Sequence, residues 1–181
     1  MKKIVLIVFT IFMFFLKNTA SANYEKKFYD FSIVSITGET INFNDYKNKA
    51  VLIVNTASYC GFTKQYDELQ ELWDLYKSRG LIVIGVPSNS FNQEKNSNND
   101  VKEFCEVNFN INFPLTTITE VKGENAHELF KWAKDNHGKS AVPKWNFHKI
   151  LINKEGKVED TFASFTNPMS KKIIKKLEKI L

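Results

Sequence analysis

Two continuous apolar runs in the first half of the chain predict strands that are buried on both faces. They cover residues 50–57 and 81–86, and both are rich in valine and isoleucine. Between them, apolar residues recur at intervals of three and four from Tyr66 to Tyr76, which predicts an amphipathic helix that Gly80 ends. This strand–helix–strand order is typical of an α/β domain.

The rest of the pattern predicts two hairpins and three more helices. Strand-like runs on either side of Thr37-Gly38-Glu39 indicate a β-hairpin within residues 31–43. A second hairpin is expected from residues 147–152 and 157–162, which flank an Asn-Lys-Glu-Gly turn. Further helices are expected at residues 98–107, residues 125–136 and from about residue 169 onward. No repeat or interdomain linker interrupts residues 23–181, which are therefore expected to form one domain.

The first 22 residues follow a different pattern. Lys2 and Lys3 precede an apolar stretch over residues 4–16, and Ala20-Ser21-Ala22 follows shortly after it. A basic start, a short apolar core and small residues are typical of a cleavable secretory signal. The alternative is an uncleaved anchor, but a membrane-spanning helix needs about 20 apolar residues. The segment predicts an exported, periplasmic protein from which residues 1–22 are removed.

Charge and composition exclude several classes of function. Removal of the signal would take away three lysines and no acid, so the formal net charge of +5 would fall to +2. So small a charge does not favour nucleic-acid binding. Arg79 is the only arginine, which leaves little for bidentate recognition of phosphate or carboxylate. Neither a metal nor another bound cofactor is expected, because no tight ligand spacing joins His127, His137 and His148.

The two cysteines, Cys60 and Cys105, are the main candidates for chemistry. In an exported protein an even count also fits a structural disulfide, although a domain of this size does not need one. Cys60 lies between a buried strand and a helix, where backbone N–H groups and the helix dipole favour the reactive thiolate. A buried, inert cysteine is the alternative. Thr63 stands where a C-x-x-C pair would have its second cysteine, which excludes local dithiol chemistry.

Three segments resemble, in order, the motifs of the glutathione peroxidase family. They are VNTASYCGFT at residues 54–63, PSNSFNQE at residues 87–94 and KWNF at residues 144–147. The resemblance extends from about Phe28 to the C-terminus. It implies a thioredoxin-like fold, with a central mixed sheet flanked by helices and an N-terminal β-hairpin. It also implies a thiol peroxidase that reduces hydrogen peroxide and organic or lipid hydroperoxides through a sulfenic acid on Cys60.

The resemblance further implies a catalytic tetrad of Cys60, Gln93, Trp145 and Asn146. The amide and indole N–H groups of such a tetrad can stabilise a thiolate and the oxygen that leaves as negative charge develops on it. The sequence departs from the family pattern in the second motif, where the loop before the glutamine is one residue short. Asn92 is therefore an alternative to Gln93.

The sulfenic acid must afterwards be reduced, and Cys105 is the candidate resolving residue. It lies on the helix that carries the resolving cysteine in thioredoxin-linked relatives, and the alternative is a structural cysteine buried in the core. A disulfide requires Cα atoms within about 7 Å, so this helix would have to unwind in part. The expected reductant is a thioredoxin-like protein, with glutathione as the alternative.

The resemblance also suggests how open the site is. The connection from about Asn136 to the Trp145 motif is short, and relatives with a short connection here tend to lack a large tetramer interface, which implies a monomer or homodimer. Such relatives leave the site accessible to bulky lipid hydroperoxides, including those in membranes.

Two other functions remain open from the sequence. One is a non-catalytic thioredoxin-fold binding protein that a Cys60–Cys105 disulfide stabilises. The other is an exported thiol–disulfide oxidoreductase or methionine-repair enzyme. The first would consume no peroxide, and the second would reduce disulfides or methionine sulfoxide without preferring peroxides.

Overall fold

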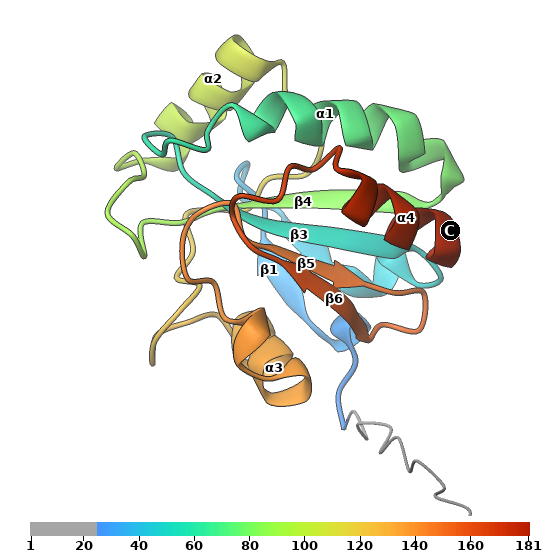
Figure 1. Cartoon of the computed structure of the whole chain (residues 1–181). Helices are drawn as coiled ribbons and strands as arrows, with labels where there is room; N and C mark the ends of the chain where they lie inside the picture. Colours follow the sequence, from blue (N-terminus) through green and yellow to red (C-terminus); the bar gives the residue numbers. More distant parts are fainter. Residues whose placement is uncertain (1–24) are drawn as a thin grey trace, which may run out of the picture.

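A four-stranded mixed sheet runs through the computed structural model, which describes residues 25–181 (Figure 1). Its strands, in the order β4-β3-β5-β6 across the sheet, are β4 (Leu81–Pro87), β3 (Ala50–Thr56), β5 (Lys149–Ile152) and β6 (Val158–Phe162). β3 and β4 are parallel, and the other neighbours are antiparallel. The expected signal at residues 1–22 lies outside the described residues.

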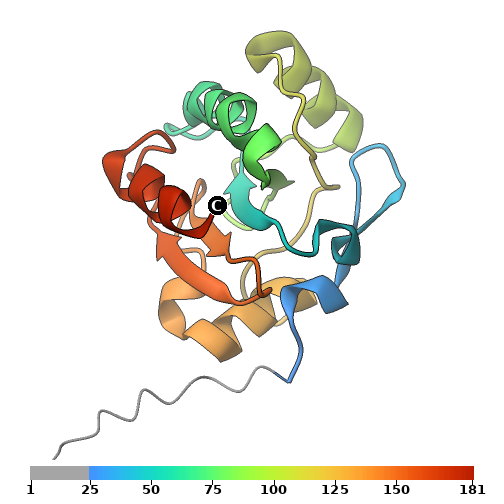
Figure 2. The same cartoon turned by 90° about the vertical axis from the view of Figure 1, so that its right-hand side faces the viewer.

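The sheet separates two hydrophobic cores. Every residue of β3 and of β4 is buried, which explains why these strands are continuous apolar runs rather than alternating ones. Leu52 and Val54 point into the core beneath α1, α2 and α4, whereas Val51 and Ile53 point into the core beneath α3 and the N-terminal segment. Figure 2 shows these helices on opposite sides of the sheet.

Four helices cover the sheet at the places that the sequence predicted. They are α1 (Gln65–Tyr76), α2 (Asn98–Phe109), α3 (Glu128–His137) and α4 (Lys171–Ile180). α3 begins three residues later than expected, because the His127 side chain accepts a hydrogen bond from the Leu129 N–H and caps the helix there. Among the described residues, no helix is both long and apolar enough to cross a membrane.

Both predicted hairpins are confirmed. The first is a separate two-stranded sheet of β1 (Ser32–Val34) and β2 (Thr40–Asn42). The second joins β5 to β6 and turns at Gly156, whose φ is +76°. A Cβ atom at that glycine would lie 2.8 Å from ring carbons of Tyr29, so both the backbone and the packing require glycine. The Phe28 N–H bonds to the Gly156 carbonyl at 3.0 Å, which ties the N-terminal segment to this turn.

Candidate active site

Cys60 lies in the turn between β3 and α1, and it is 7% exposed. Thr63 closes this turn: its hydroxyl accepts the Cys60 N–H at 3.1 Å and lies within hydrogen-bond distance of the Cys60 and Ala57 carbonyls. The Phe62 N–H points at the Cys60 sulfur from 3.5 Å. α1 itself begins only at Gln65, so the sulfur faces a turn N–H rather than the first turn of the helix.

Gln93 bonds the cysteine turn through its main chain and Asn146 through its side chain. Its carbonyl accepts the N–H of Tyr59 at 3.0 Å, directly before Cys60. Its side-chain Oε1 accepts the Nδ2–H of Asn146, also at 3.0 Å. Asn92 is exposed and has a left-handed backbone, with φ of +56°, which accommodates the short loop. The structure therefore brings Gln93, and not Asn92, to Asn146.

Asn55 holds the tryptophan–asparagine segment in place, and the sequence analysis did not single it out. It lies near the end of β3 and is 1% exposed. Its side chain donates to the Trp145 carbonyl at 3.2 Å and accepts the His148 N–H at 3.1 Å. Its main chain bonds the same segment, accepting the Phe147 N–H at 2.6 Å. A polar residue in an otherwise apolar strand was the signal that could have identified it.

Phe147 has a strained backbone beside these groups. Its φ is +61°, a left-handed conformation that a bulky residue rarely adopts. The ring is fully buried and contacts Tyr66 edge-on, with ring centres 5.4 Å apart. Left-handed residues cost free energy and persist where the surrounding packing imposes them, often at functional sites.

Trp145 and Asn146 differ in their exposure to solvent. Asn146 is fully buried, whereas Trp145 is 42% exposed and packs against Phe91 with ring centres 5.3 Å apart. Within the described part of the chain, the indole N–H of Trp145 has no hydrogen-bond partner and can donate to a ligand. The Asn146 Oδ1 is likewise buried without a partner.

The carboxylate of Glu94 is buried close to the cysteine turn. Glu94 accepts the N–H groups of Ser58 at 3.0 Å and Lys95 at 2.8 Å through one carboxylate oxygen, and its other oxygen is buried without a partner. Burial raises the pKa of Glu94. The Glu94 carboxylate thus links the Gln93 loop, through Lys95, to the cysteine turn, through Ser58.

Cys105 is a fully buried free thiol on α2. It shares a hydrophobic core with Cys60, and its sulfur lies beside the hydroxyl of Tyr66. Burial raises the pKa of the Cys105 thiol to about 11, and the negative charge of Glu94 adds to this effect. Cys105 is therefore protonated at neutral pH, and the two cysteines are not disulfide-bonded.

The histidines do not form a metal centre. In residues 25–181 no three histidine, cysteine or acidic side chains are grouped closely enough to hold a metal ion. His148 is buried beside Asn146, and burial together with the charges of Lys149 and Lys144 lowers the pKa of its imidazole to about 4. Its ring is neutral at pH 7, and its Nε2 has no partner among the described residues.

Comparison with known proteins points to one family. The family model described as glutathione peroxidase matches residues 28–134. The glutathione peroxidase of Lactococcus lactis is 43% identical and covers 78% of this chain and 92% of its own length. The hydroperoxy fatty acid reductase gpx1 of Synechocystis is 40% identical and covers 90% and 99%. The glutathione peroxidase-like peroxiredoxin 2 of Saccharomyces cerevisiae is also 40% identical, covering 79% and 91%.

Solved structures agree on the fold. Trgpx in its apo form has a TM-score of 0.67 and 34% identity, covering 86% of this chain and 95% of its own. A thioredoxin-family thiol:disulfide interchange protein of Chlorobium tepidum has a TM-score of 0.62 at 18% identity, and it covers 83% and 92%. The second likeness concerns the fold alone. Together they confirm the expected thioredoxin-like fold.

Replacing Asn55 by Ala should destabilise the protein and the site together. The substitution removes two side-chain hydrogen bonds to the 145–148 segment and leaves buried backbone groups unpaired. We expect the free energy of unfolding to fall by about 2–3 kcal/mol, measured by urea denaturation. Asn136→Ala is the control, because that side chain bonds only within its own helix. An equal loss in both variants would contradict the role given to Asn55.

The raised pKa of Cys105 predicts unequal reactivity of the two thiols. Because a thiol with a pKa of about 11 is only about 0.1% ionised at pH 8, iodoacetamide should alkylate Cys105 on the order of 10² times more slowly than a free cysteine of pKa about 8.5, and more slowly than Cys60. Mass spectrometry of the native protein measures both rates, and urea should remove most of the difference. Cys60→Ser should show only the slow reaction. Equal rates in the native protein would show that Cys105 is accessible.

Proposed function

The chain belongs to the glutathione peroxidase family, and we propose that it reduces hydroperoxides with the Cys60 thiol as the attacking group. Gln93, Trp145 and Asn146 complete the proposed site. One observation carries this assignment: Gln93 joins the two other segments, bonding Tyr59 beside Cys60 through its carbonyl and Asn146 through its side chain. Hydrogen bonds thus link the second motif both to the cysteine turn and to the tryptophan–asparagine motif.

In the first half of the reaction, the Cys60 thiolate attacks one oxygen of the peroxide. A sulfur–oxygen bond forms as the oxygen–oxygen bond breaks, so sulfur is oxidised to a sulfenic acid. The other oxygen leaves with the electron pair and takes up a proton, giving water or an alcohol. The Phe62 N–H, 3.5 Å from the sulfur, favours the thiolate, and the unpaired indole N–H of Trp145 can stabilise the leaving oxygen.

In the second half, the Cys105 thiol attacks the sulfenic sulfur, which forms a disulfide and releases water. This step requires α2 to unwind in part, since Cys105 is fully buried. The weak anchoring of α2 supports such a motion: only Val101 and Cys105 are buried among its residues, and Val107 is 76% exposed. The disulfide is then reduced by two electrons.

No bound cofactor takes part, and thioredoxin or glutathione serves as the reductant, as in related peroxiredoxins. We favour a thioredoxin-like donor, because a dithiol reduces a Cys60–Cys105 disulfide in one exchange sequence. The single arginine supports this choice, since Arg79 is held by Glu178 at 2.7 Å and is not available to bind glutathione.

Organic and lipid hydroperoxides belong to the proposed substrate range. Tyr59 directly precedes Cys60 in the sequence, and Trp145 belongs to the proposed tetrad. Their side chains are 64% and 42% exposed, which favours an open site. The relative from Synechocystis is a hydroperoxy fatty acid reductase by name. A secretory signal at residues 1–22 would direct this activity to the periplasm, close to membrane lipids. There the protein is expected to act as a monomer or homodimer.

Peroxide consumption by residues 23–181 tests the function. With thioredoxin and its reductase, wild type should consume hydrogen peroxide and cumene hydroperoxide, and Cys60→Ser should fall to background. Cys105→Ser should still reduce one equivalent of peroxide in a single turnover but should lose thioredoxin-linked cycling. Full cycling by Cys105→Ser would make Cys105 structural. Consumption of no peroxide by wild type would overturn the proposed function and favour a binding protein.

A matched pair of loop variants tests Gln93. Gln93→Ala removes the amide that bonds Asn146 and should lower the rate of Cys60 oxidation by about 10²-fold. Asn92→Gly keeps the left-handed backbone of the short loop and should leave that rate unchanged. Stopped-flow tryptophan fluorescence follows the oxidation. A loss of rate in Asn92→Gly alone would make Asn92 the functional amide.

A further inference from the structure

Lys95 links the turn that carries Cys60 to the helix that carries Cys105. Its ammonium lies 5.0 Å from the ring centre of Tyr59 and 5.2 Å from the ring centre of Phe104. Tyr59 directly precedes Cys60 in the turn. Phe104 directly precedes Cys105 on α2. Since α2 lies beside the loop that joins β3 to α1 (Figure 1), one side chain bridges the two places where the proposed chemistry occurs.

Hydrogen bonds hold Lys95 on the cysteine turn. Its Nζ donates to the Tyr59 hydroxyl at 3.2 Å, and this bond raises the pKa of Lys95, so the ammonium is charged at neutral pH. Its main-chain N–H donates to the Glu94 carboxylate, whose same oxygen also accepts the Ser58 N–H. A cation within about 6 Å of a ring face is attracted to that ring, so the charge of Lys95 draws Tyr59 and α2 together.

This contact matters because α2 has few other anchors. Of its 12 residues, only Val101 and Cys105 are buried. Phe104, which receives the ammonium of Lys95, is half-buried. An element with little buried surface opens at a small cost in free energy, so the loss of one contact changes its open population measurably.

We propose that Lys95 is a positioning residue that holds α2 against the cysteine turn and thereby sets how fast Cys105 reaches Cys60. The inference rests on the proposed peroxidase function and concerns its second half. In that step the Cys105 thiol attacks the sulfenic sulfur, and a sulfur–sulfur bond forms as the sulfur–oxygen bond breaks. The hydroxyl group leaves with the thiol proton as water. Because α2 opens before this attack, the contact between Lys95 and Phe104 is released first.

Hydrogen exchange of the reduced protein, residues 23–181, tests the contact without any peroxide. Lys95→Met removes the charge and keeps a long side chain, and the exchange rate of the α2 amides should rise about three- to tenfold. Lys95→Arg also stacks a cation on aromatic rings and should return this rate to within about twofold of wild type. Lys102→Met is the matched control, since this lysine of α2 pairs with Glu106 of the same helix. It should change the rate by less than about twofold.

An unchanged exchange rate in Lys95→Met would overturn the inference, as would an equal rise in Lys102→Met. A rise that Lys95→Arg does not reverse would also overturn it, because the charge would then have no part in holding α2.

A single turnover separates this inference from the proposed function. Each reduced variant is mixed with one equivalent of hydrogen peroxide, and acid quenching with mass spectrometry follows the sulfenic acid and the disulfide over time. In Lys95→Met the disulfide should form about three- to tenfold faster, because α2 is open more often, while the oxidation rate of Cys60 should not change. Lys95→Arg should form the disulfide at the wild-type rate.

Equal rates of disulfide formation in wild type and Lys95→Met would refute the role of Lys95 even if peroxide is consumed. Faster exchange of α2 in Lys95→Met, in a protein that consumes no peroxide, would refute the peroxidase and still support the contact between Lys95 and α2.

Discussion

The amide of Asn55 is buried at the end of a strand whose other side chains are mostly apolar, and it cannot remain there unpaired. A buried amide without partners costs on the order of 1–3 kcal/mol, so the chain must bring a donor and an acceptor to it. The Trp145 carbonyl and the His148 N–H supply them. Because these two groups flank Asn146, satisfying Asn55 also fixes where the functional amide lies relative to the cysteine turn.

The same segment contains Phe147, whose left-handed backbone is stabilised by a hydrogen bond to Asn55 and by the packing of its ring. The Phe147 N–H bonds the Asn55 carbonyl at 2.6 Å, and its ring is enclosed against Tyr66. Packing and hydrogen bonding thus offset a backbone strain of about 1–3 kcal/mol. These contacts hold Asn146 against Gln93, which would preorganise the proposed site for developing charge.

The two cysteines differ in their surroundings. Cys60 faces a backbone N–H in a turn, whereas Cys105 is enclosed on α2, where burial keeps it a protonated thiol. In the proposed mechanism this difference leaves Cys60 as the attacking sulfur while α2 is closed. If Cys105 resolves the sulfenic acid as proposed, the second step requires α2 to open, and only Val101 and Cys105 of this helix are buried.

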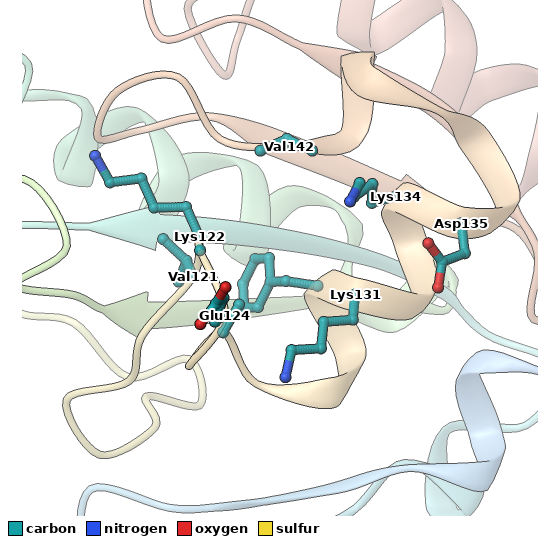
Figure 3. Close-up of a pocket in the computed structure, with 10 residues that line it drawn as sticks. Val121, Lys122, Glu124, Lys131, Lys134, Asp135 and Val142 are labelled. Carbon is teal, nitrogen blue, oxygen red and sulfur yellow. The ribbon is translucent and has the colours of Figure 1, made fainter.

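The amino-acid sequence by itself predicted the secondary elements and the family, and it singled out Cys60 as the candidate reactive cysteine. Continuous apolar runs identify β3 and β4 because strands buried on both faces cannot alternate, and turn residues mark both hairpins. Helix ends were less certain from sequence, as the late start of α3 at Glu128 shows, because a side-chain cap at His127 decided it. Only the tertiary structure decided between Gln93 and Asn92, revealed the role of Asn55, and placed Cys105 in a core beside Tyr66. It also shows that the 121–126 loop and α3 line a common groove (Figure 3). Each of these features depends on contacts between residues far apart in the chain, and local periodicity carries no information about which distant group will satisfy a buried donor.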